Sequence, residues 1–520
     1  MDTMGTKNTK KSVVLNHTIK TFVPFVFFVS FASIVFFVLL AQENVSVPEL
    51  SADLERFVDN VLALDITPGM TIAIVRDKEV IYAKGFGVAD HDTRRPVTAD
   101  TQFYIASTTK SITALAAAVL AQRKAIDLDA PLSGALPGVK LHERLSADRI
   151  TLRDLLTHTH GIAPGGPVDF RTAYTGDFTG PQLLDLLAAH PPAPSGRSFS
   201  YSNLGYNIFS LVLDRVFREG WKEVIDREVL RPLGMRNTTA FMSKTDRSQL
   251  AQPYELRPDG PQRVNYAKQD GNMHAAGGYL STANDLARYL IAHINGGRIG
   301  TTQAIPQKAI AETHRQQAVQ DRVFGSFQRF GWGLGWDLAT YDGDTVLQRF
   351  GGFRGFFSHV SFMPARRIGV VVLANGGSAG GMVADAVATF AYDRLLNKPP
   401  QRQQDRWREF TDAVARGRAS IARDLATRQS RPQTTPLALP AYAGTYESRA
   451  LGSMVWTLEN NRLQVAMGIA RGMAEAYDAA KHQFRVDLTG GGSVVSFRVT
   501  PGAPAPESLQ FQNQTFTRVR

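Results

Sequence analysis

The chain has 520 residues, more than one ordinary hydrophobic core can hold, so its length favours two or more domains. It contains no cysteine, which excludes disulfides, thiolate catalysis and cysteine-ligated zinc or iron–sulfur sites. The formal net charge of +11 suits an anionic surface such as a membrane or a cell-wall polymer, but no long basic block or nucleic-acid-binding module is present, so no nucleic acid partner is expected.

An apolar segment stands near the start of the chain. Residues 21–41 carry no charge and are mainly Phe, Val, Leu and Ile, and a helix of that length spans one hydrocarbon core. Lysines precede the segment and acidic residues follow it, so residues 1–20 are expected to form a cytoplasmic tail, with the rest periplasmic or extracellular. We favour an uncleaved transmembrane signal-anchor, because the run is longer than the apolar region of a usual signal peptide; a cleaved, secreted form is the alternative.

Residues 48–398 are expected to form one α/β (α+β) domain. It begins with an amphipathic helix over residues 49–64. Runs rich in β-branched and aromatic residues then predict two hairpins, one over residues 70–75 and 79–83 and one over residues 356–363 and 368–374. Helical stretches and long Gly/Pro loops lie between them. The pattern predicts an antiparallel sheet, flanked by helices, that takes strands from both ends of the domain.

Two further segments follow this domain. Residues 399–440 contain a polar helical stretch, with an apolar stripe near Trp407, Phe410 and Val414, and then a Pro-rich linker. In residues 441–520 short β-like runs alternate with turns, which predicts a small all-β domain.

The first candidate for chemistry is the tetrapeptide Ser107-Thr108-Thr109-Lys110, which opens an Ala-rich helical stretch. In a loop followed by a helix, this spacing puts a hydroxyl in the first turn and an amine one turn later on the same face. A helix N-terminus favours developing negative charge, and a partly desolvated lysine can activate a serine as a nucleophile. The motif is short, and in many helices such a lysine is simply solvated, so it needs support from the rest of the chain.

A second candidate is Tyr201-Ser202-Asn203. A phenol beside a Ser–Lys pair can move protons when nearby cations lower its pKa from about 10. The amide of Asn203 could hold Lys110 and donate a hydrogen bond to a substrate. The alternative interpretation is a turn before a helix, in which Tyr201 is a packing residue.

A third candidate is the pair Gly351-Gly352, just before the predicted strand over residues 356–363. Glycine lets a substrate approach a strand closely. A backbone N–H at that edge could complete an oxyanion hole with the N–H of Ser107.

These motifs together resemble the serine β-lactamase and penicillin-binding-protein superfamily, in its class C β-lactamase, D-Ala-D-Ala carboxypeptidase and esterase branch. Similar stretches occur at residues 150–161, 276–282, 333–336 and 368–375. The resemblance implies a β-lactamase/DD-peptidase-like fold and acyl-enzyme chemistry without a cofactor. It also implies a small-molecule or peptide substrate, which could be derived from the cell wall.

The resemblance also implies a role for each residue. Ser107 is the acylated nucleophile, Lys110 orients it and takes part in proton transfer, and Tyr201 is the general base or its acid partner. Asn203 contacts the substrate and the lysine, and the N–H groups of Ser107 and Gly352 form the oxyanion hole. How Lys110 and Tyr201 divide the base role stays open. The expected function is that of a membrane-anchored serine hydrolase acting on an ester, a D-amino-acid peptide or, as the least favoured class, a β-lactam.

The third motif departs from the family pattern of Lys or His followed by Thr, Ser or Gly and then Gly. Counting back from Gly355 places Arg349 at the basic position, Phe350 at the hydroxyl position and Gly351 at the glycine; a one-residue slip would put Phe350 at the basic position. Arginine can bind a carboxylate but cannot shuttle a proton near pH 7. Because Phe350 offers no hydroxyl to a β-lactam carboxylate, the substitution favours ester or peptide substrates. It also motivates the alternative of a catalytically degenerate penicillin-binding-protein-like binding or regulatory protein.

His158 and His160 form a His-x-His pair that could suggest a metal site. No third histidine or carboxylate stands nearby at ligand spacing, and the family has a similar loop, so we expect a structural role and no metal. Trp332 and Trp336 could line the cleft or fill the core.

Overall fold

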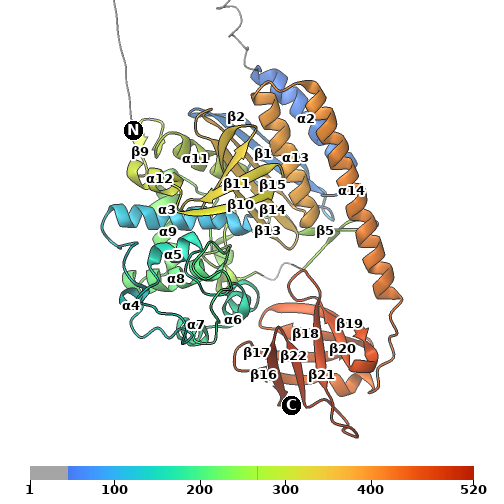
Figure 1. Ribbon diagram of the computed structural model, residues 1–520. Coiled ribbons are helices and arrows are strands. Elements are labelled where there is room, and N and C mark those ends of the chain that lie inside the picture. The colour runs from blue at the N-terminus through green and yellow to red at the C-terminus, as the bar shows by residue number, and fades with distance from the viewer. Residues whose placement is uncertain (1–44, 266–267, 520) are drawn as a thin grey trace, which may run out of the picture. The chain divides into compact units, whose positions relative to one another are not determined.

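The computed structural model describes residues 45–265 and 268–519 (Figure 1). The predicted tail over residues 1–20 and the predicted span over residues 21–41 lie outside the described residues. Within the described ranges, no helix is both long enough and apolar enough to cross a membrane.

A nine-stranded antiparallel sheet forms the centre of the larger domain, in the order β10-β11-β12-β13-β14-β15-β1-β2-β3 (Figure 1). The two predicted hairpins are β1 (Gly69–Arg76) with β2 (Glu79–Asp90), and β14 (Phe356–Met363) with β15 (Ile368–Ala374). β1 pairs with β15, so one sheet is built from both ends of the domain, as predicted. Burial explains the pairing, because every residue of β15 and all but the last residue of β1 are buried.

The sheet extends through four strands in a region where the sequence pattern predicts none, because Gly, Arg and Gln interrupt the apolar runs. They are β10 (Ala318–Phe324), β11 (Phe327–Trp332), β12 (Asp337–Tyr341) and β13 (Asp344–Phe353), while β3 (Arg95–Pro96) ends the sheet on the other side. β12 pairs with β13 only as far as Gln348. In the described chain, residues 349–353 therefore pair with β14 alone, which leaves their other edge open to the cleft.

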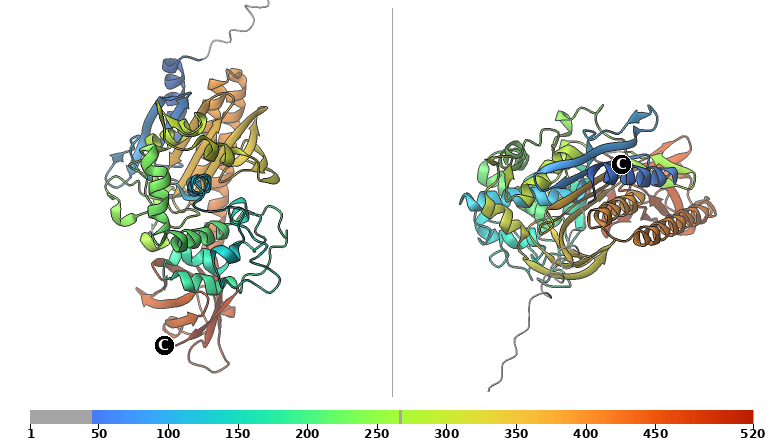
Figure 2. Two further views of the ribbon diagram at one scale, coloured as in Figure 1. Left: turned by 90° about the vertical axis from the view of Figure 1, so that its left-hand side faces the viewer. Right: turned by 90° about the horizontal axis from the view of Figure 1, so that it is seen from above.

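Helices lie on both sides of this sheet (Figures 1 and 2). On one side are α2 (Val47–Ala63), α13 (Ser378–Leu395) and α14 (Pro400–Gln429); α13 packs on β14 and β15, and α2 and α14 both pack on α13. On the other side are α11 (Ala283–Ile294) and the central α3 (Thr109–Gln122). A separate cluster of buried apolar side chains fills each side, so the sheet lies between two cores.

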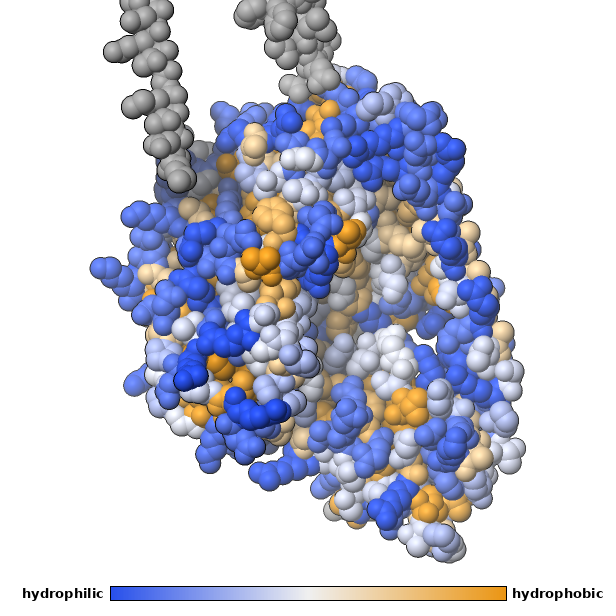
Figure 3. Space-filling view, in the orientation of Figure 1, coloured by the Kyte–Doolittle hydropathy of each residue, from blue (hydrophilic) through white to orange (hydrophobic). Residues whose placement is uncertain are grey.

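The helices α2 and α14 confirm the predictions for residues 49–64 and for the polar stretch after residue 399. The Ser46 hydroxyl caps α2 by accepting a hydrogen bond from the Glu49 N–H (3.3 Å). α14 buries Phe410 and Val414 against the core, and Figure 3 shows hydrophilic side chains along its outer side. Most of the stability of such a polar helix comes from packing its single apolar stripe.

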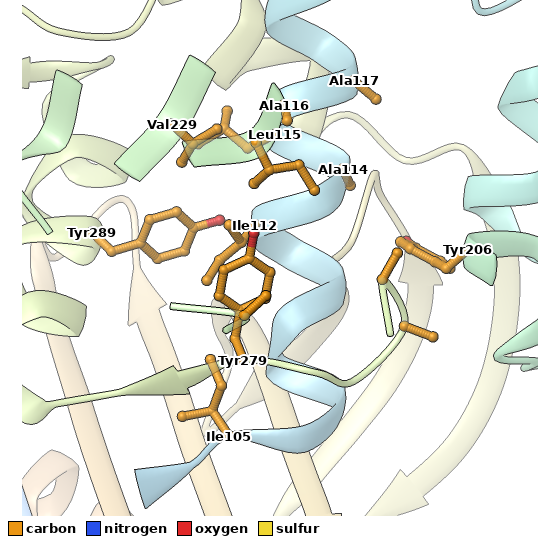
Figure 4. Packing of buried hydrophobic residues seen from close by; sticks show 14 of the residues in the cluster. Ile105, Ile112, Ala114, Leu115, Ala116, Ala117, Tyr206, Val229, Tyr279 and Tyr289 are labelled. Atoms are coloured by element: carbon orange, nitrogen blue, oxygen red, sulfur yellow. The ribbon is translucent and has the colours of Figure 1, made fainter. Parts of the chain in front are cut away.

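The helix α3 runs through the middle of the first core, and every residue from Thr109 to Leu120 is buried. Its many alanines let neighbours approach closely, and Figure 4 shows Ile112 and Leu115 among side chains from other elements, including Val229 and Tyr289. A helix buried on all sides is held in a fixed position, so the residues of its first turn are held as well.

The remaining elements surround α3 or lie at the rim of the domain. The other α-helices are α4 (Leu132–Ala135), α5 (Leu152–Thr157), α6 (Gly166–Phe170), α7 (Gly180–Leu187), α8 (Leu204–Phe217), α9 (Trp221–Ile225), α10 (Arg231–Leu233) and α12 (Gln307–His314). Three two-stranded sheets are formed by β4 (Phe103–Tyr104) with β7 (Leu280–Ser281), β5 (Tyr254–Arg257) with β6 (Gly260–Arg263), and β8 (Arg298–Ile299) with β9 (Thr302–Gln303).

The C-terminal part is an all-β module, as predicted, and its strands close into a barrel. The strands are β16 (Gly444–Ser448), β17 (Gly452–Glu459), β18 (Arg462–Met467), β19 (Ala470–Asp478), β20 (Gln483–Val486), β21 (Ser493–Arg498), β22 (Ser508–Phe511) and β23 (Gln514–Arg518). The sequence pattern does not predict β19, whose alanines and glycine have low β-propensity. Aromatic side chains such as Trp456, Phe484 and Phe497 fill the barrel interior.

Candidate active site

Ser107 lies on a short turn between β4 and α3. It belongs to a 3₁₀ turn, Ala106–Thr108, which runs directly into α3. Ala106 has a φ of 43°, a left-handed conformation that costs a non-glycine residue about 1 to 2 kcal/mol. The Tyr279 backbone holds the turn from outside: its carbonyl accepts from the Ile105 N–H (3.0 Å) and its N–H donates to Thr109 Oγ1 (3.1 Å). The turn is therefore strained and fixed at the same time.

Two buried hydroxyls tie this turn to the sheet. Ser358 Oγ on β14 donates to the Ile105 carbonyl (2.8 Å) and lies 2.9 Å from Thr108 Oγ1. Both side chains are fully buried. They fix the distance between the turn that carries Ser107 and the strand pair β13–β14.

Lys110 is fully buried and faces Ser107 across one helical turn. Its Nζ donates to Asn203 Oδ1 (2.7 Å) and to the Ala276 carbonyl (2.7 Å), and it lies 3.2 Å from Ser107 Oγ. The first two oxygens can only accept, so the remaining position on Nζ faces Ser107. Burial lowers the pKa of Lys110, and the nearby Arg349 charge acts in the same direction.

Tyr201 lies just before α8, and its ring packs against the rings of His158 and Trp332. Its ring is 4.7 Å from that of His158 and 5.9 Å from that of Trp332, centroid to centroid. His158 Nδ1 accepts a hydrogen bond from the Ser202 N–H (3.2 Å), which fixes the backbone beside Tyr201. Trp332 in turn donates from Nε1 to the Leu156 carbonyl (3.0 Å). His158 and Trp332 thus hold the ring of Tyr201 in place by packing against it.

Cations surround the Tyr201 phenol. Arg349 Nη2 donates to its hydroxyl (3.2 Å), and Lys110 Nζ lies 4.9 Å from the ring centroid. Burial opposes ionisation of Tyr201, but the charges of Lys110 and Arg349 outweigh it and lower the pKa to about 8. A phenol with that pKa is about one-tenth phenolate at pH 7, against roughly a thousandth for an ordinary tyrosine, and the phenolate can take a proton.

Arg349 is buried and held by a carboxylate on the neighbouring strand. Its Nη1 donates to Asp337 Oδ2 (2.6 Å), and Gln320 donates to the other oxygen of Asp337 (2.9 Å). Both ionised side chains are almost fully buried, at 3% and 0% exposure. Asp337 thus turns the guanidinium so that Nη2 reaches Tyr201 and approaches the Ser107 carbonyl (3.4 Å).

The two glycines of β13 have different surroundings. A Cβ at Gly351 would lie 2.0 Å from the Ile105 carbonyl oxygen and 2.9 Å from the Ser107 nitrogen, so only glycine lets the strand approach the turn this closely. A Cβ at Gly352 would touch only the Phe357 ring, at 3.2 Å. Gly352 is exposed and follows Gly351 on the open edge of β13, where an oxyanion-hole donor beside Ser107 is required.

The structure therefore brings together Ser107, Lys110, Tyr201, Asn203 and Arg349, with Gly351 against the turn and Gly352 next to it. Phe350 lies on the opposite face of β13, where its ring packs on Phe324, Phe327 and His359. This alternation follows from strand geometry and puts Arg349, without a one-residue slip, at the basic position. It also means that the ring of Phe350 does not point at Tyr201.

The remaining candidates are structural in this fold. His160 Nδ1 accepts the Ile162 N–H (3.1 Å), and burial lowers its pKa to about 4, so it is neutral. Trp336 is fully buried against Tyr289 and Phe362. Among the residues that the structure describes, no group of histidines and carboxylates is arranged to hold a metal ion.

Sequence reasoning missed three contributors to the site: Asp337, the Thr108–Ser358 pair and the Ala276 carbonyl. Asp337 acts across the neighbouring strands β12 and β13, and the other two act between segments far apart in the chain, so no local motif marks any of them. The one available signal is Asp337 itself, a lone carboxylate directly after Trp336, because an isolated charge among apolar residues needs a partner.

The fold and the site define a class of protein: an α/β domain with a buried lysine beside a serine on a helix N-terminus, and a tyrosine between two cations. A sequence model described as Beta-lactamase matches residues 54–394. The chain therefore belongs to the beta-lactamase family, as its motifs indicated.

Two curated relatives illustrate the range of this family. Unguisins hydrolase ungD of Aspergillus violaceofuscus is 27% identical over 453 residues, which cover 81% of this chain and 78% of that protein. Penicillin-binding protein 4 of Amycolatopsis lactamdurans is 26% identical over 334 residues, which cover 64% of this chain and 86% of that protein.

Solved structures share the fold. The octameric penicillin-binding protein homologue from Pyrococcus abyssi has a TM-score of 0.57 and 23% identity, covering 90% of this chain and all of that one. A class C beta-lactamase has a TM-score of 0.55 and 22% identity, covering 68% of this chain and 98% of that one. At this level of identity the likeness shows the fold alone.

Proposed function

We propose that this protein is a serine hydrolase that works through an acyl-enzyme on Ser107. The observation that carries the proposal is the arrangement around one hydroxyl: Lys110 Nζ at 3.2 Å, and beyond it a tyrosine whose pKa is lowered by two cations. Such an arrangement supplies both a nucleophile and a proton acceptor. The strained, doubly tethered turn keeps Ser107 in place for attack.

The acylation step follows from these positions. Ser107 Oγ attacks the substrate carbonyl carbon, and its proton passes to the Tyr201 phenolate or to neutral Lys110. The carbonyl oxygen becomes an anion that accepts hydrogen bonds from the N–H groups of Ser107 and Gly352. The bond to the leaving group then breaks and the leaving group takes up the proton, after which water hydrolyses the ester on Ser107 by the same steps in reverse order.

The substrate classes proposed are esters and D-amino-acid peptides, with β-lactams as the least favoured. Arg349 supplies a fixed positive charge in place of a residue able to exchange protons. The names of relatives and fold neighbours include Unguisins hydrolase ungD, a hydrolase with promiscuous acyltransferase activity and a D-amino acid amidase. Cell-wall fragments belong to the D-amino-acid peptide class.

The test is a panel of nitrocefin, p-nitrophenyl acetate, p-nitrophenyl butyrate and a D-Ala-D-Ala peptide, each with the wild type and with Ser107→Ala. We expect turnover of an ester or the peptide, and a fall of several orders of magnitude in Ser107→Ala. A fluorophosphonate probe should label the wild type and not the variant. Equal labelling of both proteins would refute the proposal.

The alternative is a binding or regulatory protein on a degenerate scaffold, and one observation favours it: Arg349 is locked in an ion pair with Asp337. This alternative predicts tight ligand binding and no turnover of any panel substrate. Hydrolysis that depends on Ser107 would exclude it.

For location, we propose that residues 21–41 anchor the chain by a single N-terminal span, with the catalytic domain periplasmic or extracellular. The support is the uncharged 21-residue run with lysines before it. Membrane fractionation tests this. A soluble mature protein that begins after Ala41 would show a cleaved signal peptide instead.

A further inference from the structure

A buried asparagine lies one helical turn beyond Asn203 on α8. Asn207 is 2% exposed, and its backbone N–H donates to the Asn203 carbonyl (3.1 Å). Residues four apart in a helix lie on the same face, one turn from each other. The side chain of Asn207 therefore lies beside that of Asn203, which holds Lys110 Nζ (2.7 Å).

The amide of Asn207 joins three segments of the chain. Its Nδ2 donates to Asp169 Oδ1 (3.2 Å) on α6 and to Thr172 Oγ1 (3.0 Å), and its Oδ1 lies 3.1 Å from His274 Nδ1. Thr172 Oγ1 gives its own hydrogen to the Val168 carbonyl (2.9 Å), so it accepts from Asn207. Both amide hydrogens are thus used. The network therefore assigns a proton to His274 Nδ1, which donates to Asn207 Oδ1.

His274 belongs to the turn that carries the second oxygen bound to Lys110. Burial lowers the pKa of His274 well below its usual value, and the charges of Lys268 and Lys110 act in the same direction, so the ring is neutral. The Gly277 N–H donates to the His274 carbonyl (3.0 Å), and a Cβ at Gly277 would lie 3.2 Å from His274 Nε2. Ala276, whose carbonyl accepts from Lys110 (2.7 Å), lies inside this turn, so its position follows that of the His274 ring.

Asp169 brings a negative charge to the same network. Burial raises its pKa to about 7, although hydrogen bonds and the Lys110 charge lower it. The carboxyl group is therefore mostly ionised at pH 8. Burial and the Arg349 charge lower the pKa of Lys110, and the Asp169 charge acts against them. Asp169 thus favours the protonated form of the buried lysine.

Several other titratable groups surround these two. Among the residues that the structure describes, the groups that interact with the Lys110 charge include Tyr201, Arg349, Asp169, His158 and His274. The two histidines are neutral, because burial lowers the pKa of both. Asp169 also faces Tyr174, a phenol that burial and the Asp169 charge keep neutral by raising its pKa. Asp169 is thus the carboxylate that acts on Lys110 from α6.

We propose that Asn207 and Asp169 are positioning residues for Lys110. Asn207 couples the two oxygens that hold the ammonium group, because one lies a turn away on α8 and the other lies in the His274 turn. Asp169 supplies a negative charge that offsets the buried ammonium. This inference rests on the proposed acyl-enzyme function at Ser107, which requires a correctly placed lysine.

The test is the second-order rate constant for labelling of Ser107 by a fluorophosphonate probe, measured on the full chain as a function of pH. Asn207→Ala should lower this rate about tenfold or more, because Lys110 loses its fixed position. Asn375→Ala is the matched control: Asn375 is also buried and donates from Nδ2 to a backbone carbonyl, that of Val88 (3.1 Å). Its rate should stay within about twofold of the wild type. Equal losses in two variants that circular dichroism shows to be folded would overturn the role of Asn207.

Asp169→Asn removes the charge and keeps an oxygen that can accept from Asn207. Lys110 should then lose its proton at lower pH, so the change in labelling rate that accompanies this loss should move to lower pH, whichever form of the lysine is the active one. Asp185→Asn is the matched control, because Asp185 is exposed on α7, and the profile should not move.

An unchanged pH profile in Asp169→Asn, or an equal shift in Asp185→Asn, would overturn the role of Asp169. If the probe labels the wild type and all four variants alike, the inference is wrong and the proposed function stands. If the probe does not label the wild type, the proposed function is wrong, and this inference is wrong with it.

Discussion

The pairing of Arg349 with Tyr201 predicts how activity depends on pH. If the Tyr201 phenolate accepts the Ser107 proton, kcat/KM should rise with pH through the Tyr201 pKa of about 8. Replacing Arg349 by Gln removes the cation that donates to the phenol at 3.2 Å. A hydrogen bond to a charged group contributes about 1.5 to 3 kcal/mol, which is roughly 1 to 2 pKa units. The rising limb should therefore move to about pH 9 to 10.

Asp337→Asn supplies a control of opposite sign. It removes a negative charge that lies 2.6 Å from the same guanidinium and that partly offsets the effect of Arg349 on Tyr201. The Tyr201 pKa should therefore fall, and the rise of kcat/KM with pH should move below pH 8. The assay is the pH profile of kcat/KM for p-nitrophenyl acetate, with circular dichroism to confirm folding at each pH.

If the rise of kcat/KM with pH stays at the same pH in Arg349→Gln, this reasoning is wrong. The role of Lys110 needs a separate measurement, because Arg349 also lowers the Lys110 pKa and its removal would shift a lysine limb in the same direction. Tyr201→Phe separates the two. If it keeps most activity and the same limb, Lys110 is the base; if activity is lost, Tyr201 is the base.

Three further predictions test the supports of the site. Gly351→Ala should abolish activity, because the added Cβ would lie 2.0 Å from the Ile105 carbonyl oxygen. Gly352→Ala should keep most of the activity, because its Cβ would meet only the Phe357 ring, at 3.2 Å. Ester turnover by the folded variants tests both expectations. Ser358→Ala should lower the free energy of unfolding by about 1 to 3 kcal/mol, because two buried oxygens lose their partner, which urea denaturation measures. The free energy of unfolding should fall as the pH is lowered. Burial lowers the pKa of His160 to about 4 and that of His359 to about 3 in the folded protein. In the unfolded chain both histidines take up a proton near their ordinary pKa of about 6.5, so acid favours the unfolded state. The loss should begin near pH 6.5 and reach roughly 1.4 kcal/mol per histidine at pH 5.5, and a flat Tm between pH 7 and 5.5 would contradict it.

Patterns of apolar residues predicted the frame of the fold well. The central strands β1 and β15 are nearly continuous apolar runs, and burial on both faces of the sheet requires such runs. The strands β10 to β13 were missed, because they carry Gln320, Arg329, Gln348 and Arg349 at positions where a predicted strand would have an apolar residue. Several of these polar side chains are buried around Asp337, so they are satisfied by one another rather than by water.

The same physical reason limits what the sequence could predict of the site. Ser107 and Lys110 are separated by one helical turn, so local geometry alone places them together. Tyr201 and Arg349 meet only because the sheet and α8 are packed on the same core, and no spacing in the chain encodes that distance. Asp337 adds a further step: it sets the direction of Arg349, which together with Lys110 lowers the pKa of Tyr201. A change at Asp337, in a strand without a motif, would therefore change proton transfer at a serine 230 positions earlier in the chain.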